Sequence, residues 1–223
     1  MVPKAILFDL DETLTDRSQS LMKYSYAFLE SFDNYLSVTS PEEIYQLLKI
    51  ADGNGYRSRE EVFAQLTEEL PWAYKPPETS RINEHWASTF PLCSTAITGM
   101  YEVLDNLKSL GIMLGIITNG GSISQNRKID ALGIREYLST IIISESVNVK
   151  KPDEKIFAIA LGEINVNASD TWYIGDHPVN DILGSSSAGI TPVWIRGIHP
   201  WVEGYDKPQY QIDSLNQLLS LMY

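Results

Sequence analysis

The sequence predicts an α/β fold: a doubly wound parallel sheet with an inserted α-helical subdomain. Short apolar runs that end in polar residues alternate with stretches of helical periodicity through the second half of the chain. Strands alternating with helices form right-handed β-α-β units, which give a parallel sheet with helices on both faces. A long block with helical patterns separates the first apolar run from the others.

The predicted strands are short and apolar. Residues 5–8 are entirely apolar, which is typical of a strand buried on both faces of a parallel sheet. Further strands are predicted at residues 112–117, 140–143, 171–174 and 191–195, with a short last one at 211–212. Helices are predicted at residues 99–109, 122–132, 153–164, 179–188 and 214–221.

The block at residues 16–91 carries helical signals alone. Apolar residues recur at spacings of three and four between Leu21 and Phe32, and a second helix follows Pro41. Ser58 with Glu61 forms a capping-box pattern before a third helix, and residues 78–90 predict a fourth. We therefore expect a catalytic core of residues 1–15 and 92–223, with residues 16–91 as a helical cap.

Composition limits the possible partners and compartments. The formal net charge of −12 argues against nucleic acid, whose binding depends on clustered Lys and Arg. No apolar run reaches the ~18 residues of a membrane span, and no signal-peptide pattern opens the chain. The single cysteine, Cys93, excludes an intrachain disulfide, so we expect a reducing, cytoplasmic compartment. Cys93 itself is expected to be a small buried residue that fills space in a core.

The first candidate site residues are Asp9 and Asp11, which follow the first predicted strand. Ligands of open α/β sheets bind beyond the carboxyl ends of the strands, so both carboxylates are expected there. Two neighbouring carboxylates repel unless one is protonated or a cation lies between them, and Mg²⁺ is the simplest such cation. Taken alone, the pair is equally consistent with a polar turn after a strand.

Polar residues at three further points of the core give this pair a context. Thr118 and Asn119 follow one predicted strand, Lys151 precedes a helix, and Asp176 and Asp181 lie where another strand enters a helix. A parallel sheet gathers such groups along one edge. Their chemistry suits phosphoryl transfer, because hydroxyl and ammonium groups bind phosphoryl oxygens and carboxylates hold a metal.

Each residue has an expected task. Asp9 is able to attack phosphorus and form an aspartyl-phosphate, and Asp11 to protonate the leaving oxygen and later deprotonate water. Asp176 would hold the metal together with Asp9. Asp181 is either a second metal ligand or a residue that orients Lys151.

Four motifs in this order resemble those of the haloacid dehalogenase superfamily of phosphotransferases. They are Asp-Leu-Asp-Glu-Thr-Leu at residues 9–14, Thr-Asn-Gly at 118–120, Lys-Pro-Asp at 151–153, and Gly-Asp at 175–176 followed by Asn-Asp at 180–181. The resemblance spans nearly the whole chain, with a helical cap inserted after the first motif.

The resemblance implies a nucleophile at Asp9 and an acid/base at Asp11. It also implies that phosphate is bound by Thr118, Lys151 and the amides of Leu10, Asp11 and Asn119. The Mg²⁺ ligands that it implies are Asp9, the Asp11 carbonyl and Asp176, and Asp181 is a less certain ligand. Members that resemble dehalogenases lack a carboxylate at the position of Asp11, so Asp11 favours phosphate ester chemistry.

We therefore predict a Mg²⁺-dependent phosphatase that acts on a small soluble phosphomonoester, such as a nucleoside monophosphate, a sugar phosphate or phosphoglycolate. A phosphomutase acting on a sugar phosphate and a catalytically silent binding module of the same fold are the alternatives. The sequence does not name the substrate, and a monomer and a homodimer both remain open.

Other polar or aromatic residues are given structural roles. His177 is expected in a turn, and His85 and Trp86 in packing on a cap helix. Solvated surface is the prediction for a set of basic residues: Arg17, Arg57, Arg127 and Lys128.

Overall fold

The computed structural model describes residues 2–55 and 57–222 of the chain. Its backbone forms two compact units. One comprises Met1–Thr15 and Ala96–Tyr223, and the other is Asp16–Thr95. The helical unit thus runs four residues further than the cap of the sequence analysis, which ended at residue 91. The first unit contains two hydrophobic cores, and the second unit contains one of its own.

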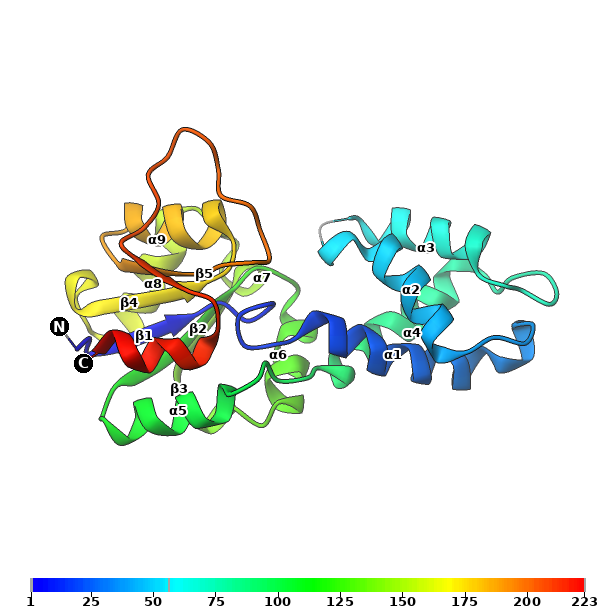
Figure 1. Cartoon of the computed structure of the whole chain (residues 1–223), viewed down its shortest axis with the longest axis horizontal. Coiled ribbons are helices and arrows are strands. Elements are labelled where there is room, and N and C mark those ends of the chain that lie inside the picture. Colours follow the sequence, from blue (N-terminus) through cyan, green and yellow to red (C-terminus); the bar gives the residue numbers. More distant parts are fainter. Residues whose placement is uncertain (1, 56, 223) are drawn as a thin grey trace. The chain divides into compact units, whose positions relative to one another are not determined.

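Within the described residues, the first unit is built on one six-stranded sheet with the order β3-β2-β1-β4-β5-β6, and every neighbouring pair is parallel (Figure 1). The strands are β1 (Ala5–Phe8), β2 (Met113–Thr118), β3 (Leu138–Ile143), β4 (Thr171–Gly175), β5 (Thr191–Ile195) and β6 (Tyr210–Ile212). This confirms the predicted α/β class, including the helical insertion between β1 and β2 and the short last strand.

Helices follow the strands in the first unit, namely α5 (Met100–Ser109), α6 (Ser122–Ala131), α7 (Ser144–Val147), α8 (Glu154–Ile164) and α9 (Gly184–Ser187). The helix expected at 179–188 differs in detail, because a π-helical segment, Pro178–Leu183, precedes α9. The last segment, Leu215–Met222, is 3₁₀-helical, and α7 was not predicted.

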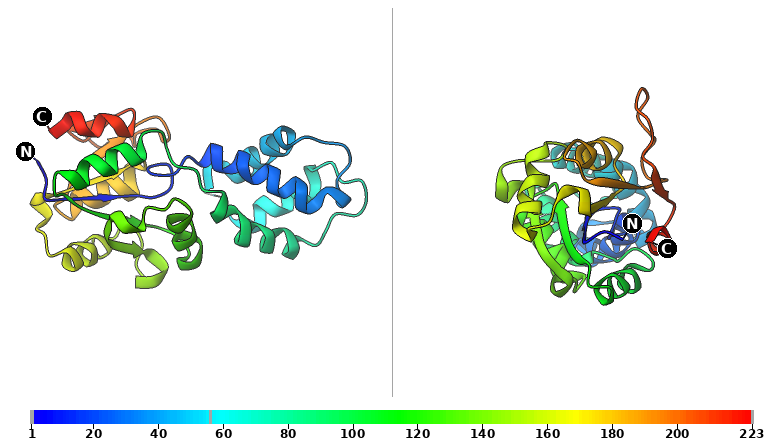
Figure 2. Two further views of the ribbon diagram at one scale, coloured as in Figure 1. Left: turned by 90° about the horizontal axis from the view of Figure 1, so that it is seen from below. Right: turned by 90° about the vertical axis from the view of Figure 1, so that its left-hand side faces the viewer.

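Alternate residues of β1 enter different cores, as the two-residue period of a strand requires. Ile6 and Phe8 of β1 belong to the core that includes α5 and the segment Leu215–Met222, which lie side by side in Figure 2, left. Ala5 and Leu7 belong to the core that includes α8. Both faces of β1 are therefore covered, which explains its uninterrupted apolar sequence.

The second unit is helical and consists mainly of α1 (Arg17–Phe32), α2 (Pro41–Asp52), α3 (Arg59–Glu69) and α4 (Thr79–Thr89). The Ser58–Glu61 capping box predicted from the sequence is present at the start of α3. The core combines aliphatic and aromatic side chains, with Trp86 stacked on Phe90 at a centroid distance of 4.1 Å. Cys93 is buried in this core, as expected of a filler residue.

A buried ion pair joins α1 to the end of α2. Arg17 Nε and Nη2 lie 2.7 Å and 2.6 Å from the two carboxylate oxygens of Asp52, and the residues are 7% and 0% exposed. The prediction of a solvated Arg17 is therefore wrong, because its partner lies 35 positions away and leaves no local signal. His85 packs as expected, with Nδ1 2.9 Å from the Tyr24 hydroxyl.

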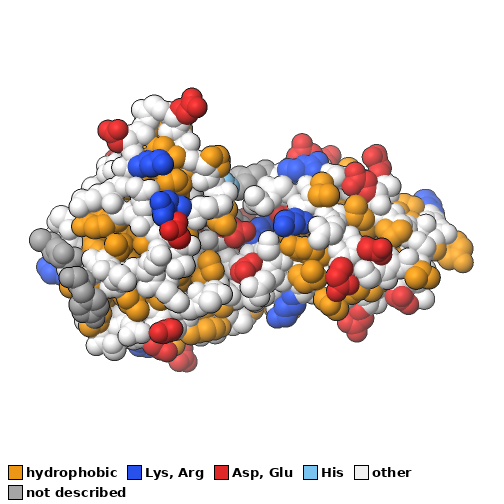
Figure 3. All heavy atoms as spheres, viewed as in Figure 1, with side chains coloured by type: hydrophobic (Ala, Val, Ile, Leu, Met, Phe, Trp, Pro, Cys, Tyr) orange, Lys and Arg blue, Asp and Glu red, His pale blue; other side chains and the backbone are white. Residues whose placement is uncertain are grey.

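In the view of Figure 3, acidic side chains are spread over the surface of both units and basic side chains lie among them. Across the residues described, no helix has the length and apolar character needed to cross a membrane.

Candidate active site

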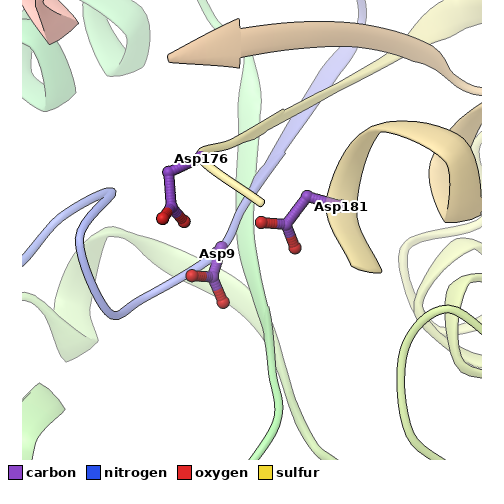
Figure 4. Close-up of side chains that lie close together, drawn as sticks. All are labelled: Asp9, Asp176 and Asp181. Atoms are coloured by element: carbon purple, nitrogen blue, oxygen red, sulfur yellow. The ribbon is translucent and has the colours of Figure 1, made fainter. Parts of the chain in front are cut away.

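Three buried carboxylates converge at the carboxyl edge of the sheet (Figure 4). Asp9 directly follows β1, Asp176 directly follows β4, and Asp181 lies in the π-helical segment after it. One oxygen from each carboxylate lies within 4.8 Å of those of the other two. The polar residues that the sequence placed at separate strand ends thus meet here.

The pairing of β1 with β4 brings Asp9 and Asp176 together. Phe8 is in register with Ile174, and the Asp9 amide donates a 2.9 Å hydrogen bond to the Ile174 carbonyl. The Trp194 indole on β5 donates to the Asp176 carbonyl at 2.9 Å. Hydrogen bonds with neighbouring strands therefore fix the backbone of both Asp9 and Asp176.

Gly175 makes room for Asp181. A Cβ at this position would lie 2.5 Å from both Cβ and Cγ of Asp181, closer than real Cβ atoms approach. The Asp181 carboxylate occupies this space and accepts a 2.9 Å hydrogen bond from the His177 amide through Oδ2. The absence of a side chain at Gly175 is thus part of the geometry of the site.

Lys151 lies among these acids and is 3% exposed. Its Nζ is 2.6 Å from Asp9 Oδ1, 2.7 Å from Asp181 Oδ1 and 2.8 Å from the Tyr173 hydroxyl. The ammonium group has three hydrogens, so these acceptors match its donors. Burial alone would lower the pKa of Lys151, but the carboxylates of Asp181 and Asp9 outweigh burial and raise it.

Asn119 connects the end of β2 to the loop that carries Lys151. Its Nδ2 donates to the Lys151 carbonyl at 3.1 Å, and its Oδ1 accepts from the Lys151 amide at 2.9 Å. This reciprocal pair fixes the backbone of Lys151. From the family resemblance only the Asn119 backbone amide is expected to take part, so this use of its side chain is a finding of the structure.

The acid cluster carries more negative charge than the lysine balances. Burial raises the pKa of Asp9 well above its usual range, and the charges of Asp181 and Asp176 act in the same direction against Lys151. Burial likewise raises the pKa of Asp176. Clustered carboxylate oxygens in such surroundings are the donor set that a hard divalent cation prefers, so these residues fit a metal ion.

Two histidines lie beside Asp176. His199 Nε2 is 3.3 Å from Asp176 Oδ2, and this contact raises the pKa of His199. His199 lies in the loop after β5 without a motif around it, so no sequence pattern marks it as a site residue. His177 Nδ1 accepts hydrogen bonds from the amides of Val179 and Asn180, which confirms the predicted turn role.

Asp11 is held by helix α6. Lys128 Nζ lies 2.7 Å from each oxygen of the Asp11 carboxylate, and Gln125 Nε2 lies 3.0 Å from Oδ2. Lys128 is 6% exposed, so its predicted position on a solvated helix face is wrong. Helix α6 offers few apolar side chains, and periodicity therefore gave no sign that this face is buried. The one available signal was the three-residue spacing of Gln125 and Lys128, which places both on one face.

Two predicted phosphate-binding residues complete the site. Thr118 ends β2, and its hydroxyl accepts a 2.6 Å hydrogen bond from Gln125 Nε2, which also contacts Asp11. The Leu10 side chain is buried in the core, and its carbonyl accepts from the amides of Leu14 and Thr15. These last bonds close the turn that carries Asp11.

Known proteins resemble this chain over most of its length. Residues 6–195 match the family described as haloacid dehalogenase-like hydrolase. Pyrimidine 5'-nucleotidase YjjG of Escherichia coli is 30% identical, and the match covers 97% of this chain and 96% of that protein. Glyceraldehyde 3-phosphate phosphatase of Pyrococcus abyssi is 32% identical, with 86% of this chain and 81% of that protein covered.

A solved structure shares the fold. The HAD-hydrolase YfnB of Bacillus subtilis, described as bound to magnesium, superposes with a TM-score of 0.77 at 24% identity. The match covers 100% of this chain and 99% of YfnB. Together with the family match, this confirms the predicted fold and the prediction that the chain is an enzyme of the hydrolase class. The chain belongs to the family of haloacid dehalogenase-like hydrolases.

Proposed function

We propose that the protein is a Mg²⁺-dependent phosphatase that hydrolyses a small soluble phosphomonoester through an aspartyl-phosphate at Asp9. The observation that carries this proposal is the cluster of Asp9, Asp176 and Asp181, in which Asp9 and Asp181 contact the Lys151 ammonium. Two relatives, 30% and 32% identical, are a nucleotidase and a glyceraldehyde 3-phosphate phosphatase, which supports phosphomonoester chemistry.

Asp9 is the nucleophile of this proposal. In the first step a carboxylate oxygen of Asp9 forms a bond to phosphorus, and the bond from phosphorus to the ester oxygen breaks. Lys151 lies 2.6 Å from Asp9 Oδ1 and, with its fixed positive charge, orients the carboxylate. Its charge also favours the approach of the phosphoryl oxygens.

Asp11 is the proposed acid and base. It gives a proton to the departing ester oxygen in the first step. In the second step it takes a proton from water, whose oxygen bonds to phosphorus while the bond to Asp9 breaks, and inorganic phosphate leaves. General acid–base work of this kind contributes roughly 10²–10⁴-fold in rate. Thr118 and the amides of Leu10, Asp11 and Asn119 are proposed to bind the phosphoryl oxygens.

Asp9, Asp176 and the Asp11 carbonyl are proposed to hold Mg²⁺. A bound cation would offset the repulsion among the carboxylates and the charge of the phosphoryl group. Asp181 is a less direct participant, because Oδ1 accepts from Lys151 and Oδ2 accepts from the His177 amide. We assign to Asp181 chiefly the orientation of Lys151.

The proposed substrates are nucleoside monophosphates, sugar phosphates and phosphoglycolate. The net charge of −12 disfavours a nucleic acid polymer and is compatible with a small anion, because a metal and Lys151 reverse the local charge. The named activities of the two relatives, on pyrimidine nucleotides and on glyceraldehyde 3-phosphate, define the first compounds to test.

The decisive variant is Asp9→Asn, assayed for turnover of p-nitrophenyl phosphate with Mg²⁺. We expect loss of turnover with an unchanged circular dichroism spectrum. Asp130→Asn is the matched control, because it makes the same chemical change at an exposed ion pair with Arg135 on helix α6. Undiminished turnover by Asp9→Asn would refute the proposed mechanism.

The substrate is found with a panel of phosphorylated metabolites scored by release of inorganic phosphate in the presence of Mg²⁺. Pyrimidine nucleoside monophosphates, sugar phosphates, glyceraldehyde 3-phosphate and phosphoglycolate belong in the panel. Isomerised sugar phosphate without free phosphate would favour a phosphomutase. No reaction with any compound would favour a silent binding module.

A further inference from the structure

The resting position of the Asp11 carboxylate is set by side chains that none of the four sequence motifs explains. Lys128 Nζ contacts both Asp11 oxygens at 2.7 Å, Gln125 Nε2 contacts Oδ2 at 3.0 Å, and the Thr15 hydroxyl lies 3.4 Å from Oδ1. Since a bidentate ion pair restricts rotation of a carboxylate, Asp11 is confined to one orientation.

The two helix residues are themselves fixed. Lys128 and Gln125 are 6% and 2% exposed and lie one helical turn apart on α6. Gln125 also donates to the Thr118 hydroxyl at 2.6 Å, so one amide nitrogen joins Thr118 to Asp11. Gly120, at φ = 149°, makes this possible, because a Cβ there would lie 3.0 Å from Gln125 Cγ and Cδ.

Burying a lysine is costly unless the ammonium is paired, and its partner here is a carboxylate that is 32% exposed rather than a core acid. The partner is the acid that is two residues from the proposed nucleophile, in a turn closed by hydrogen bonds to the Leu10 carbonyl.

We propose that Lys128 and Gln125 are positioning residues that hold the Asp11 carboxylate in place for proton transfer at the ester oxygen and at water. The proposal rests on the acid/base role proposed for Asp11. Lys128 and Gln125 contact the Asp11 carboxylate and are assigned no bond-making or proton-transfer step of their own. They act through Asp11, and Gln125 additionally aligns the Thr118 hydroxyl.

The kinetic consequence is specific. Positioning of a proton-transfer group alters the chemical steps and leaves ground-state binding of the substrate unchanged, so kcat falls while KM stays nearly constant. Protonation of the departing oxygen matters most for a poor leaving group. The loss is therefore larger for an alkyl phosphate such as β-glycerol phosphate than for p-nitrophenyl phosphate.

The test compares Lys128→Met, Lys128→Arg and Arg127→Met with the unmodified protein, using both substrates with Mg²⁺. Arg127 is the control because it is the exposed neighbour of Lys128 on α6. Each variant is checked by circular dichroism and thermal unfolding. Lys128→Gln, which keeps a hydrogen-bond donor of similar length, replaces Lys128→Met if the latter does not fold.

We expect kcat of Lys128→Met to fall roughly 10- to 100-fold, a share of the roughly 10²–10⁴-fold that acid–base catalysis supplies. Lys128→Arg retains charge and donors and should be closer to the unmodified protein. In an Asp11→Asn background, Lys128→Met should cause no further loss, because both changes disable the same function.

Two results would overturn the inference while leaving the proposed function intact. One is a kcat of Lys128→Met equal to that of Arg127→Met, with Asp11→Asn impaired. The other is an equal loss from Lys128→Met with and without Asp11→Asn. Full turnover by Asp11→Asn would instead refute the acid/base role of Asp11, and this inference with it.

Discussion

Gly175→Ala adds a single methyl group beside the acid cluster and offers the sharpest structural perturbation of it. The new Cβ would lie 2.5 Å from Cβ and Cγ of Asp181 and 2.6 Å from Oδ2. Because Asp181 Cβ is attached directly to the backbone, it cannot avoid the clash by a change of side-chain rotamer. The Asp181 backbone, the Gly175 strand end or both must therefore move.

The required movement follows from the distances. Tight but observed Cβ contacts begin at 3.0 Å and ordinary ones at 3.4 Å, so the atoms must separate by about 0.5–0.9 Å. Asp181 Oδ1 lies 2.7 Å from Lys151 Nζ, and a retreat of this size lengthens the contact to about 3.2–3.6 Å, which weakens or breaks the hydrogen bond. Since a displacement of ~1 Å costs on the order of 10²-fold in rate, we expect kcat to fall about 100-fold.

The assay is steady-state turnover of p-nitrophenyl phosphate with Mg²⁺, together with urea unfolding. Overpacking should also destabilise the protein by ~1–3 kcal/mol. Gly162→Ala is the matched control, because a Cβ there meets nothing within 4 Å on helix α8, and alanine should stabilise that helix by ~0.5–1 kcal/mol without altering kcat. Gly175→Ala with unchanged kcat would refute the argument that Asp181 orients Lys151.

Two further predictions concern charge. Asp176→Asn should weaken Mg²⁺ binding far more than Asp181→Asn, because of these two residues Asp176 alone is assigned as a direct ligand. Isothermal titration calorimetry without substrate measures both affinities, and the reverse order would contradict that assignment. Burial alone would raise the pKa of Asp52, but the hydrogen bonds and charge of Arg17 lower it overall. Its stabilising contribution is therefore complete above its ordinary pKa of ~3.9 and is lost as the pH falls through the lowered value. Between pH ~6 and ~3, urea unfolding should show a smaller loss of stability for Asp52→Asn than for the unmodified protein. Equal losses in the two proteins would contradict this role of the Arg17–Asp52 pair.

The sequence predicted those features that a local pattern encodes. The apolar run at residues 5–8 has the composition of a strand buried on both faces, and it forms the centre of the sheet beside β2 and β4. Because parallel strands share one carboxyl edge, the strand-end residues Asp9, Lys151, Asp176 and Asp181 come together as expected. Their chemical roles remain proposals.

The sequence did not predict the partners that only three-dimensional packing creates. Lys128 was expected in solvent because helix α6 is polar, yet it meets an acid that precedes it by 117 positions. The Arg17–Asp52 pair spans 35 positions in the same way. His199 contacts Asp176 from an irregular loop, where no periodicity indicates which side chains turn inward. An ion pair between distant residues leaves no trace in either local composition or spacing.

The central claim is that Asp9 carries the phosphoryl group during turnover. Acid quenching of the reaction, followed by borohydride reduction, converts an aspartyl-phosphate to homoserine, which peptide mass spectrometry can locate. The account predicts homoserine at position 9, dependent on both substrate and Mg²⁺. Reduction at another carboxylate, or substrate turnover by an Asp9→Asn protein that folds normally, would contradict it.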